Sequence, residues 1–87
     1  MEILKISSNS NPNSIAGVIA EQIKEYKKCE LRMIGAGAIN QGMKAIIIAK
    51  GYLAPMGINI VCVPSFTDIV IDDNTITGIK LVVKVEN

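Results

Sequence analysis

The chain has 87 residues, with nine Lys/Arg, eight Asp/Glu and no His, and its formal net charge is +1. This length suits one domain over residues 1–87, and the near-zero charge excludes a strong global field that would attract a polyanion. No apolar run reaches the ~20 residues of a membrane span, and the lone Cys29 and Cys62 favour a reducing compartment, so we expect a cytoplasmic protein without a membrane partner.

The first third predicts a strand, a polar loop and an amphipathic helix. Alternation over 2–7 indicates the strand, and small polar residues follow over 7–14. Asn13 or Ser14 is expected to cap the helix by accepting hydrogen bonds from its first free amides. Apolar residues then recur at helical spacing, namely Ile15, Val18, Ile19, Ile23 and Tyr26.

A second strand over 30–34 leads through Gly35 and Gly37 into a second helix, which we expect from about residue 38 to residue 53. Apolar side chains fill more than half of its circumference, which is more than one sheet face covers. The excess predicts a contact with another subunit. A row of small residues would let another element approach closely: Gly42, Ala45 and Ala49.

The last third predicts two strands joined by a hairpin. A β-branched run over 58–63 is interrupted by Pro64 and resumes over 66–72. Residues 72–75 form a turn signal, and 75–86 alternates as a strand. The order β-α-β-α-β-β predicts an α+β two-layer fold, in which two helices cover one face of a four-stranded mixed sheet.

The glycine pair before the second helix is the first candidate site, because the free amides and the dipole of a helix start can hold an anion. A dinucleotide fingerprint fails where Asn40 replaces its third glycine. A phosphate loop fails as well, because Lys44 comes one residue late and Ala45 lacks the magnesium-binding hydroxyl. A tight turn explains Gly35 and Gly37 individually better than ligand contact does.

Polar side chains around this junction complete the candidate site. Hydroxyl and amide groups in the loop 7–14 can contact phosphate or sugar oxygens, although a plain capping loop is the commoner structure. Lys44 shares a polar arc with Asn40 and Gln41 and either adds charge to the site or is simply solvated. The candidate phosphate-binding residues are Ser8, Asn9, Ser10, Asn13, Ser14, Gly35, Gly37, Asn40, Gln41 and Lys44.

Other reactive side chains suggest no chemistry. Asp68 is a lone carboxylate without a partner acid, base or metal cluster. The cations that interleave with glutamates predict a solvated face: Lys24, Lys27, Lys28 and Arg32. With no nucleophile–base pair and no set of metal ligands, the sequence predicts a protein that is not an enzyme and holds no metal or cofactor.

Several unusual strings resemble the stage V sporulation protein S family of endospore-forming bacteria and some relatives. The matching segments are EILKIS (2–7), PNSIAG (12–17), IGAGAINQ (34–41), Lys44-Ala45, Ile48-Ala49, Gly51, Ala54-Pro55 and CVPSFTDI (62–69). That family is similar to the Alba superfamily of chromatin and RNA-binding proteins. The resemblance implies a sheet order of 1-2-4-3 and a homodimer formed through the second helix and the last strands.

The resemblance also implies nucleic-acid contacts at 7–14, at 35–44 and at the hairpin tip, 72–75. This chain departs from the Alba pattern, because its first loop carries no lysine and its tip carries Asp72 and Asp73. We therefore expect a regulator of sporulation or development that binds RNA or DNA with modest affinity as a dimer. The alternatives are a protein–protein interaction module and a sensor of small anionic ligands.

Overall fold

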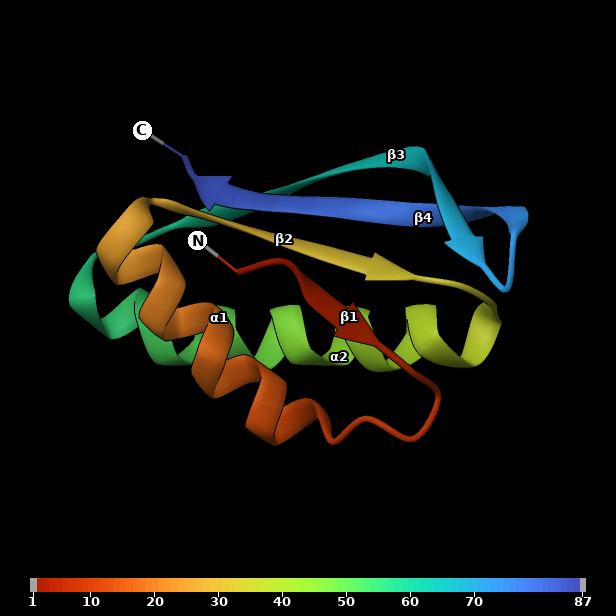
Figure 1. The fold of residues 1–87 in the computed structure, drawn as a ribbon. Coiled ribbons are helices and arrows are strands. Elements are labelled where there is room, and N and C mark those ends of the chain that lie inside the picture. Colours follow the sequence, from red (N-terminus) through yellow and green to blue (C-terminus); the bar gives the residue numbers. More distant parts are fainter. Residues whose placement is uncertain (1, 87) are drawn as a thin grey trace.

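The computed structural model describes residues 2–86 as two layers, with two helices packed on one face of a four-stranded sheet (Figure 1). The elements in chain order are β1 (Leu4–Ile6), α1 (Pro12–Tyr26), β2 (Lys28–Met33), α2 (Ala36–Leu53), a 3₁₀ turn η1 (Ala54–Met56), β3 (Ile60–Ile71) and β4 (Asn74–Val85). The predicted fold class is confirmed. Among the described residues, no helix is long and apolar enough to span a membrane.

The strands lie in the order β1-β2-β4-β3, as the family resemblance implies. β1 runs parallel to β2, and the other two pairs are antiparallel. The inward positions of the sheet meet the helices in one aliphatic core, whose largest fully buried side chains are Ile19, Ile23, Leu31, Met33, Leu53, Val83 and Cys29. No helix of the described residues lies over the opposite face of the sheet (Figure 1).

The prediction that Asn13 or Ser14 caps α1 is wrong, because the N-cap residue is Asn11. Its side-chain Oδ1 accepts hydrogen bonds from the backbone N–H groups of Asn13 (2.8 Å) and Ser14 (3.3 Å). Pro12 takes the first helical position, where its missing N–H costs nothing. The helix therefore starts earlier than the apolar spacing alone suggests.

α2 begins at Ala36, two residues earlier than predicted, and its N-cap is Gly35 at φ 88°. This positive-φ conformation is open to glycine and costly for other residues, which explains the abrupt change from strand to helix. The small-residue row packs inside the molecule. Gly42 lies so close to β2 that an added Cβ would be 2.9 Å from Sδ of Met33.

The predicted interruption at Pro64 is wrong, because β3 runs unbroken and Pro64 pairs with Leu81. β3 is an edge strand. A proline is tolerated in such a strand when its nitrogen, which carries no hydrogen, faces away from the neighbouring strand. The hairpin turn is confirmed. Asp72 and Asp73 both have positive φ, 50° and 63°, as a two-residue type I′ turn requires.

Candidate functional site

The loop between β1 and α1 packs directly on the start of α2. An added Cβ on Gly37 would lie 2.9 Å from Cβ of Ser8, so only glycine allows this approach. One turn further along α2, Nε2 of Gln41 donates a 2.9 Å hydrogen bond to the carbonyl oxygen of Ser10. The structure therefore brings together the two predicted regions, the first loop and the glycine junction.

Hydrogen bonds within the loop fix its shape. The Ser7 backbone N–H donates to Oγ of Ser10 at 2.9 Å, and the Asn9 N–H donates to Oγ of Ser7 at 3.3 Å. The Ser10 N–H also donates to the Ser7 carbonyl at 3.1 Å. Ser8 and Asn9 are exposed, whereas Ser10 is half-buried. The loop is thus a compact turn that presents Ser8 and Asn9 outward.

The two helix starts differ in what they offer an anion. At α1, the amides of Asn13 and Ser14 are occupied by Oδ1 of Asn11, so only their exposed side chains remain available. At α2, no side chain of the described residues caps the helix, and its first turn carries no carboxylate. The first helical bond is from the Ile39 N–H to the Gly35 carbonyl, so the preceding amides lie ahead of the helix ladder.

The polar arc of α2 lies beside this junction. Asn40 and Lys44 are exposed and lie one turn apart, and Gln41 is half-buried against the loop. Gln41 therefore acts as a positioning residue for the loop. Lys44 is the nearest cation along α2 to the helix start.

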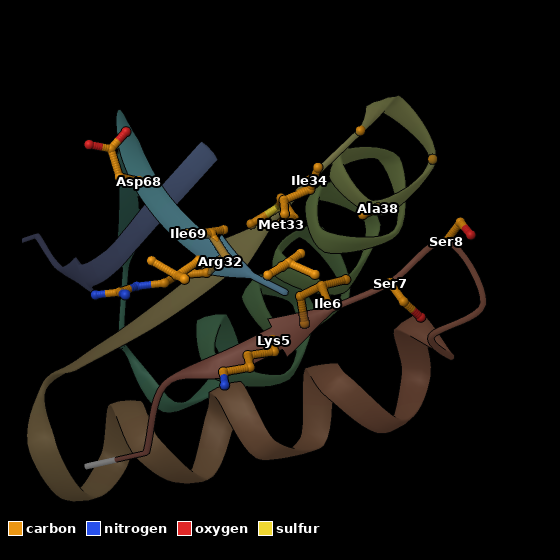
Figure 2. Close-up of a pocket in the computed structure, with 14 residues that line it drawn as sticks. Lys5, Ile6, Ser7, Ser8, Arg32, Met33, Ile34, Ala38, Asp68 and Ile69 are labelled. Carbon is orange, nitrogen blue, oxygen red and sulfur yellow. The ribbon is translucent and has the colours of Figure 1, made fainter. Parts of the chain in front are cut away.

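A groove of about 790 Å³ opens on the other side of the loop (Figure 2). Its walls are the end of β1, the end of β2, the start of α2 and the distal part of β3. Ser7, Ser8, Gly35, Gly37 and Ala38 line one part of it, and aliphatic side chains line the middle. The predicted junction is therefore one wall of a larger concave surface.

Three charged residues of the groove were not among the predicted site residues: Lys5, Arg32 and Asp68. Arg32 was expected on a solvated face, but it is half-buried and its Nε lies 2.7 Å from Oε2 of Glu30. Lys5 and Arg32 are 27 positions apart in the sequence and become neighbours only because β1 pairs with β2. Only the strand register could have identified them.

The cysteine thiols differ in exposure. Cys29 is fully buried in β2, and this burial, with a smaller effect of the Glu30 carboxylate, raises its pKa to about 11. Burial also raises the pKa of the half-buried Cys62. Both therefore stay protonated at neutral pH, and a thiolate nucleophile is disfavoured.

The structure thus describes a small two-layer α+β protein with an open sheet face, a polar loop–helix junction and a shallow groove beside it. Comparison with family models matches residues 2–86 to stage V sporulation protein S, so the chain belongs to that family. The resemblance read from the sequence strings is confirmed. The family assigns the chain a role related to sporulation.

Proposed function

We propose that this sporulation protein binds RNA or DNA without catalysing a reaction, and that it does so as a homodimer. The observation that carries the proposal is the contact of the first loop with the start of α2, where Ser8 meets Gly37 and Ser10 accepts from Gln41. This contact gathers exposed hydroxyl, amide and backbone N–H groups, which are the groups that bind phosphate oxygens. Lys44 adds a positive charge beside them.

The acidic hairpin tip limits the strength of this binding. Asp72 and Asp73 are exposed at the turn, and they repel phosphates that approach it. Few cations lie at the junction, so few counterions are released when nucleic acid binds. The affinity is accordingly modest and depends only weakly on salt.

Exposed apolar side chains support the homodimer. Ile47 on α2 is 64% exposed and Phe66 on β3 is 77% exposed, and both lie on elements through which the Alba resemblance implies a dimer. Large apolar side chains that gather into an exposed patch mark association surfaces, and the proposed dimer would cover these two. Ile47→Glu should therefore yield a monomer by light scattering, whereas Val18→Glu, on α1, should leave the dimer intact. A monomeric wild-type protein would contradict this part of the proposal.

The binding proposal is tested with labelled RNA and DNA at low salt. Lys44→Glu should weaken binding, because it reverses a charge next to the phosphate groups. Lys50→Glu is the matched control, since Lys50 is exposed on the same helix but lies in its last turn. Absence of binding by the wild-type protein would refute the proposal, and equal affinity of the two variants would remove Lys44 from the site.

A sensor of small anionic ligands is the second candidate, and the groove favours it. Its volume of about 790 Å³ falls in the range of small-molecule pockets, and Lys5 and Arg32 supply positive charge. Thermal shift with nucleotides and phosphorylated metabolites separates the two functions. A small ligand that stabilises the protein while nucleic acid fails to bind would favour the sensor.

A further inference from the structure

The open face of the sheet concentrates the positive charge of this protein. Side chains alternate along each strand, and Leu4, Leu31 and Leu81 point to the helices, so their neighbours in sequence point to the open face. Five of the nine cations lie at such outward positions: Lys5, Lys28, Arg32, Lys80 and Lys84. On the same face of β1, β2 and β4, Glu30 is the carboxylate that offsets them.

These cations form two rows across the strands. In the first row, Lys5 pairs with Arg32, and Arg32 pairs with Lys80. In the second row, Lys28 pairs with Lys84. Like charges directly opposite each other destabilise a sheet, and the ion pair of Arg32 with Glu30 offsets only one of them. The first row spans two strand spacings, about 10 Å, and is an arrangement that an anionic ligand would stabilise.

The first row, unlike the second, borders the groove. Lys5 and Arg32 line it, and in Figure 2 their charged groups point to the same side of the sheet. The carboxylate of Asp68 lies apart from them at the upper rim in this view. The accessible aliphatic lining of the groove forms a wall of Ile34, Ile69, Val70 and Ile71, whereas Ile6 and Met33 also line the groove but are buried in the core.

We propose that this groove binds one nucleotide of a single-stranded nucleic acid, with its phosphate on Lys5 and Arg32 and its base against the aliphatic wall. Apolar side chains hold unstacked bases in this way, and the cations neutralise the backbone. The volume of the groove, about 790 Å³, falls in the range of small-ligand pockets and suits a single unstacked nucleotide. The inference rests on the proposed function and adds a second contact region and a preference for single strands.

The test compares two double variants that remove the same charge from the same sheet face. Lys5→Gln with Arg32→Gln removes the cations of the groove, and Lys28→Gln with Lys84→Gln removes the second row. Fluorescence anisotropy is measured with a labelled oligouridine, with an RNA duplex, and with competing uridine monophosphate or inorganic phosphate, at several salt concentrations. Lys5→Gln alone is included because Lys5 is exposed and forms no ion pair among the described residues, so this variant should fold even if loss of Arg32 disturbs β2.

The groove variant should bind oligouridine at least about tenfold more weakly, and its salt slope should fall by about 0.7, which is the contribution of the single phosphate that Lys5 and Arg32 hold. The second-row variant should keep the wild-type slope, and Lys5→Gln should lower it by no more than about 0.7, because Arg32 still faces the same phosphate. Oligouridine should bind more tightly than the duplex, and uridine monophosphate should compete better than inorganic phosphate. Equal losses in both double variants, or equal binding of duplex and single strand, would overturn the inference. In that case, retained sensitivity to Lys44→Glu would leave the proposed function standing.

The competition experiment also distinguishes binding of a free nucleotide from binding of a nucleotide within a strand. If uridine monophosphate saturates the protein while oligouridine does not bind, the groove takes free nucleotides, and the single-strand inference is refuted. An acidic peptide that fails to displace oligouridine from the wild-type protein would support a groove that recognises nucleic acid. An acidic peptide that displaces it from the groove, with Lys5→Gln abolishing peptide binding, would refute the assignment in favour of a protein partner.

Discussion

Ser8 and Gly37 lie so close that a β-carbon on Gly37 would come within 2.9 Å of Cβ of Ser8. The first loop and the start of α2 therefore share one surface, and they can do so only because residue 37 has no side chain. The hydrogen bond from Gln41 to Ser10 holds the same pair of segments together one helical turn away. The contact between the loop and α2 thus requires the absence of a side chain at residue 37, and the hydrogen bond from Gln41 stabilises it further.

Gly37→Ala should displace the loop and destabilise the protein by about 1–3 kcal/mol, the usual cost of overpacking. Gly51→Ala is the matched control in the same helix, because an added Cβ at that position meets no atom within 4 Å. It should stabilise the helix by about 0.5–1 kcal/mol. Urea unfolding measures both changes. A neutral Gly37→Ala variant would show that the loop moves aside without cost.

Gly78→Ala should cost about 1–3 kcal/mol, because β4 approaches β2 closely at this position. An added Cβ would lie 2.9 Å from the Met33 carbonyl oxygen, and the backbone cannot rotate away as a side chain can. Gly17→Ala, in α1, meets no atom within 4 Å and should not destabilise the protein. Thermal unfolding of the pair checks the contrast, and equal melting temperatures would contradict it.

Cys29 should make the protein less stable at alkaline pH. Its pKa rises from the ordinary 9.0 to about 11 on folding, so the unfolded chain loses the thiol proton first. The contribution of the protonated Cys29 thiol to the free energy of unfolding is complete below pH 9.0 and is lost as the pH rises toward about 11. The loss reaches about 2–3 kcal/mol at the top of this window, at 1.36 kcal/mol per pH unit.

Denaturant unfolding across this window measures the effect, and Cys29→Ala is its control. Other groups also titrate at alkaline pH, so the readout is the difference in slope between the two proteins. The variant is expected to be less stable below pH 9.0 and to have the shallower slope above it. Parallel curves for the two proteins would mean that the thiol is not buried in solution.

Asp73→Gly should stabilise the hairpin by about 0.5–1 kcal/mol, because position 73 has φ 63° and glycine reaches this region without strain. It also removes one negative charge from the tip, so binding of nucleic acid should strengthen. Thr75→Gly, just outside the turn, should instead destabilise the strand. Chemical unfolding and anisotropy of the same samples report both effects. A destabilised Asp73→Gly variant would contradict the turn assignment.

The element order and the two-layer packing followed from local patterns, because periodicity and turn residues act over a few positions. The cap at Asn11 was missed because Asn13 and Ser14 are equally good capping residues, and only the backbone geometry decides between them. Pro64 misled the prediction because its meaning depends on whether the strand lies at an edge.

The candidate site was predictable only in part. The residues at the loop and at the glycine junction stand in unusual strings, and their proximity is found in the structure. Lys5 and Arg32 escaped notice because no local pattern joins residues on separate strands. Their proximity depends on the register of the parallel strands β1 and β2, which no local sequence pattern predicts. The kinship with the Alba superfamily, the dimer and nucleic-acid binding remain predictions.

Pro64 limits how copies of this protein can associate. A strand that adds to the free edge of β3 needs a regular series of backbone N–H donors along β3. Pro64 lies within β3 and has no N–H, so it leaves a gap in this series. β1, at the opposite edge, has only three residues to offer. Growth of the sheet into a continuous fibre by addition of strands is therefore discouraged at both edges.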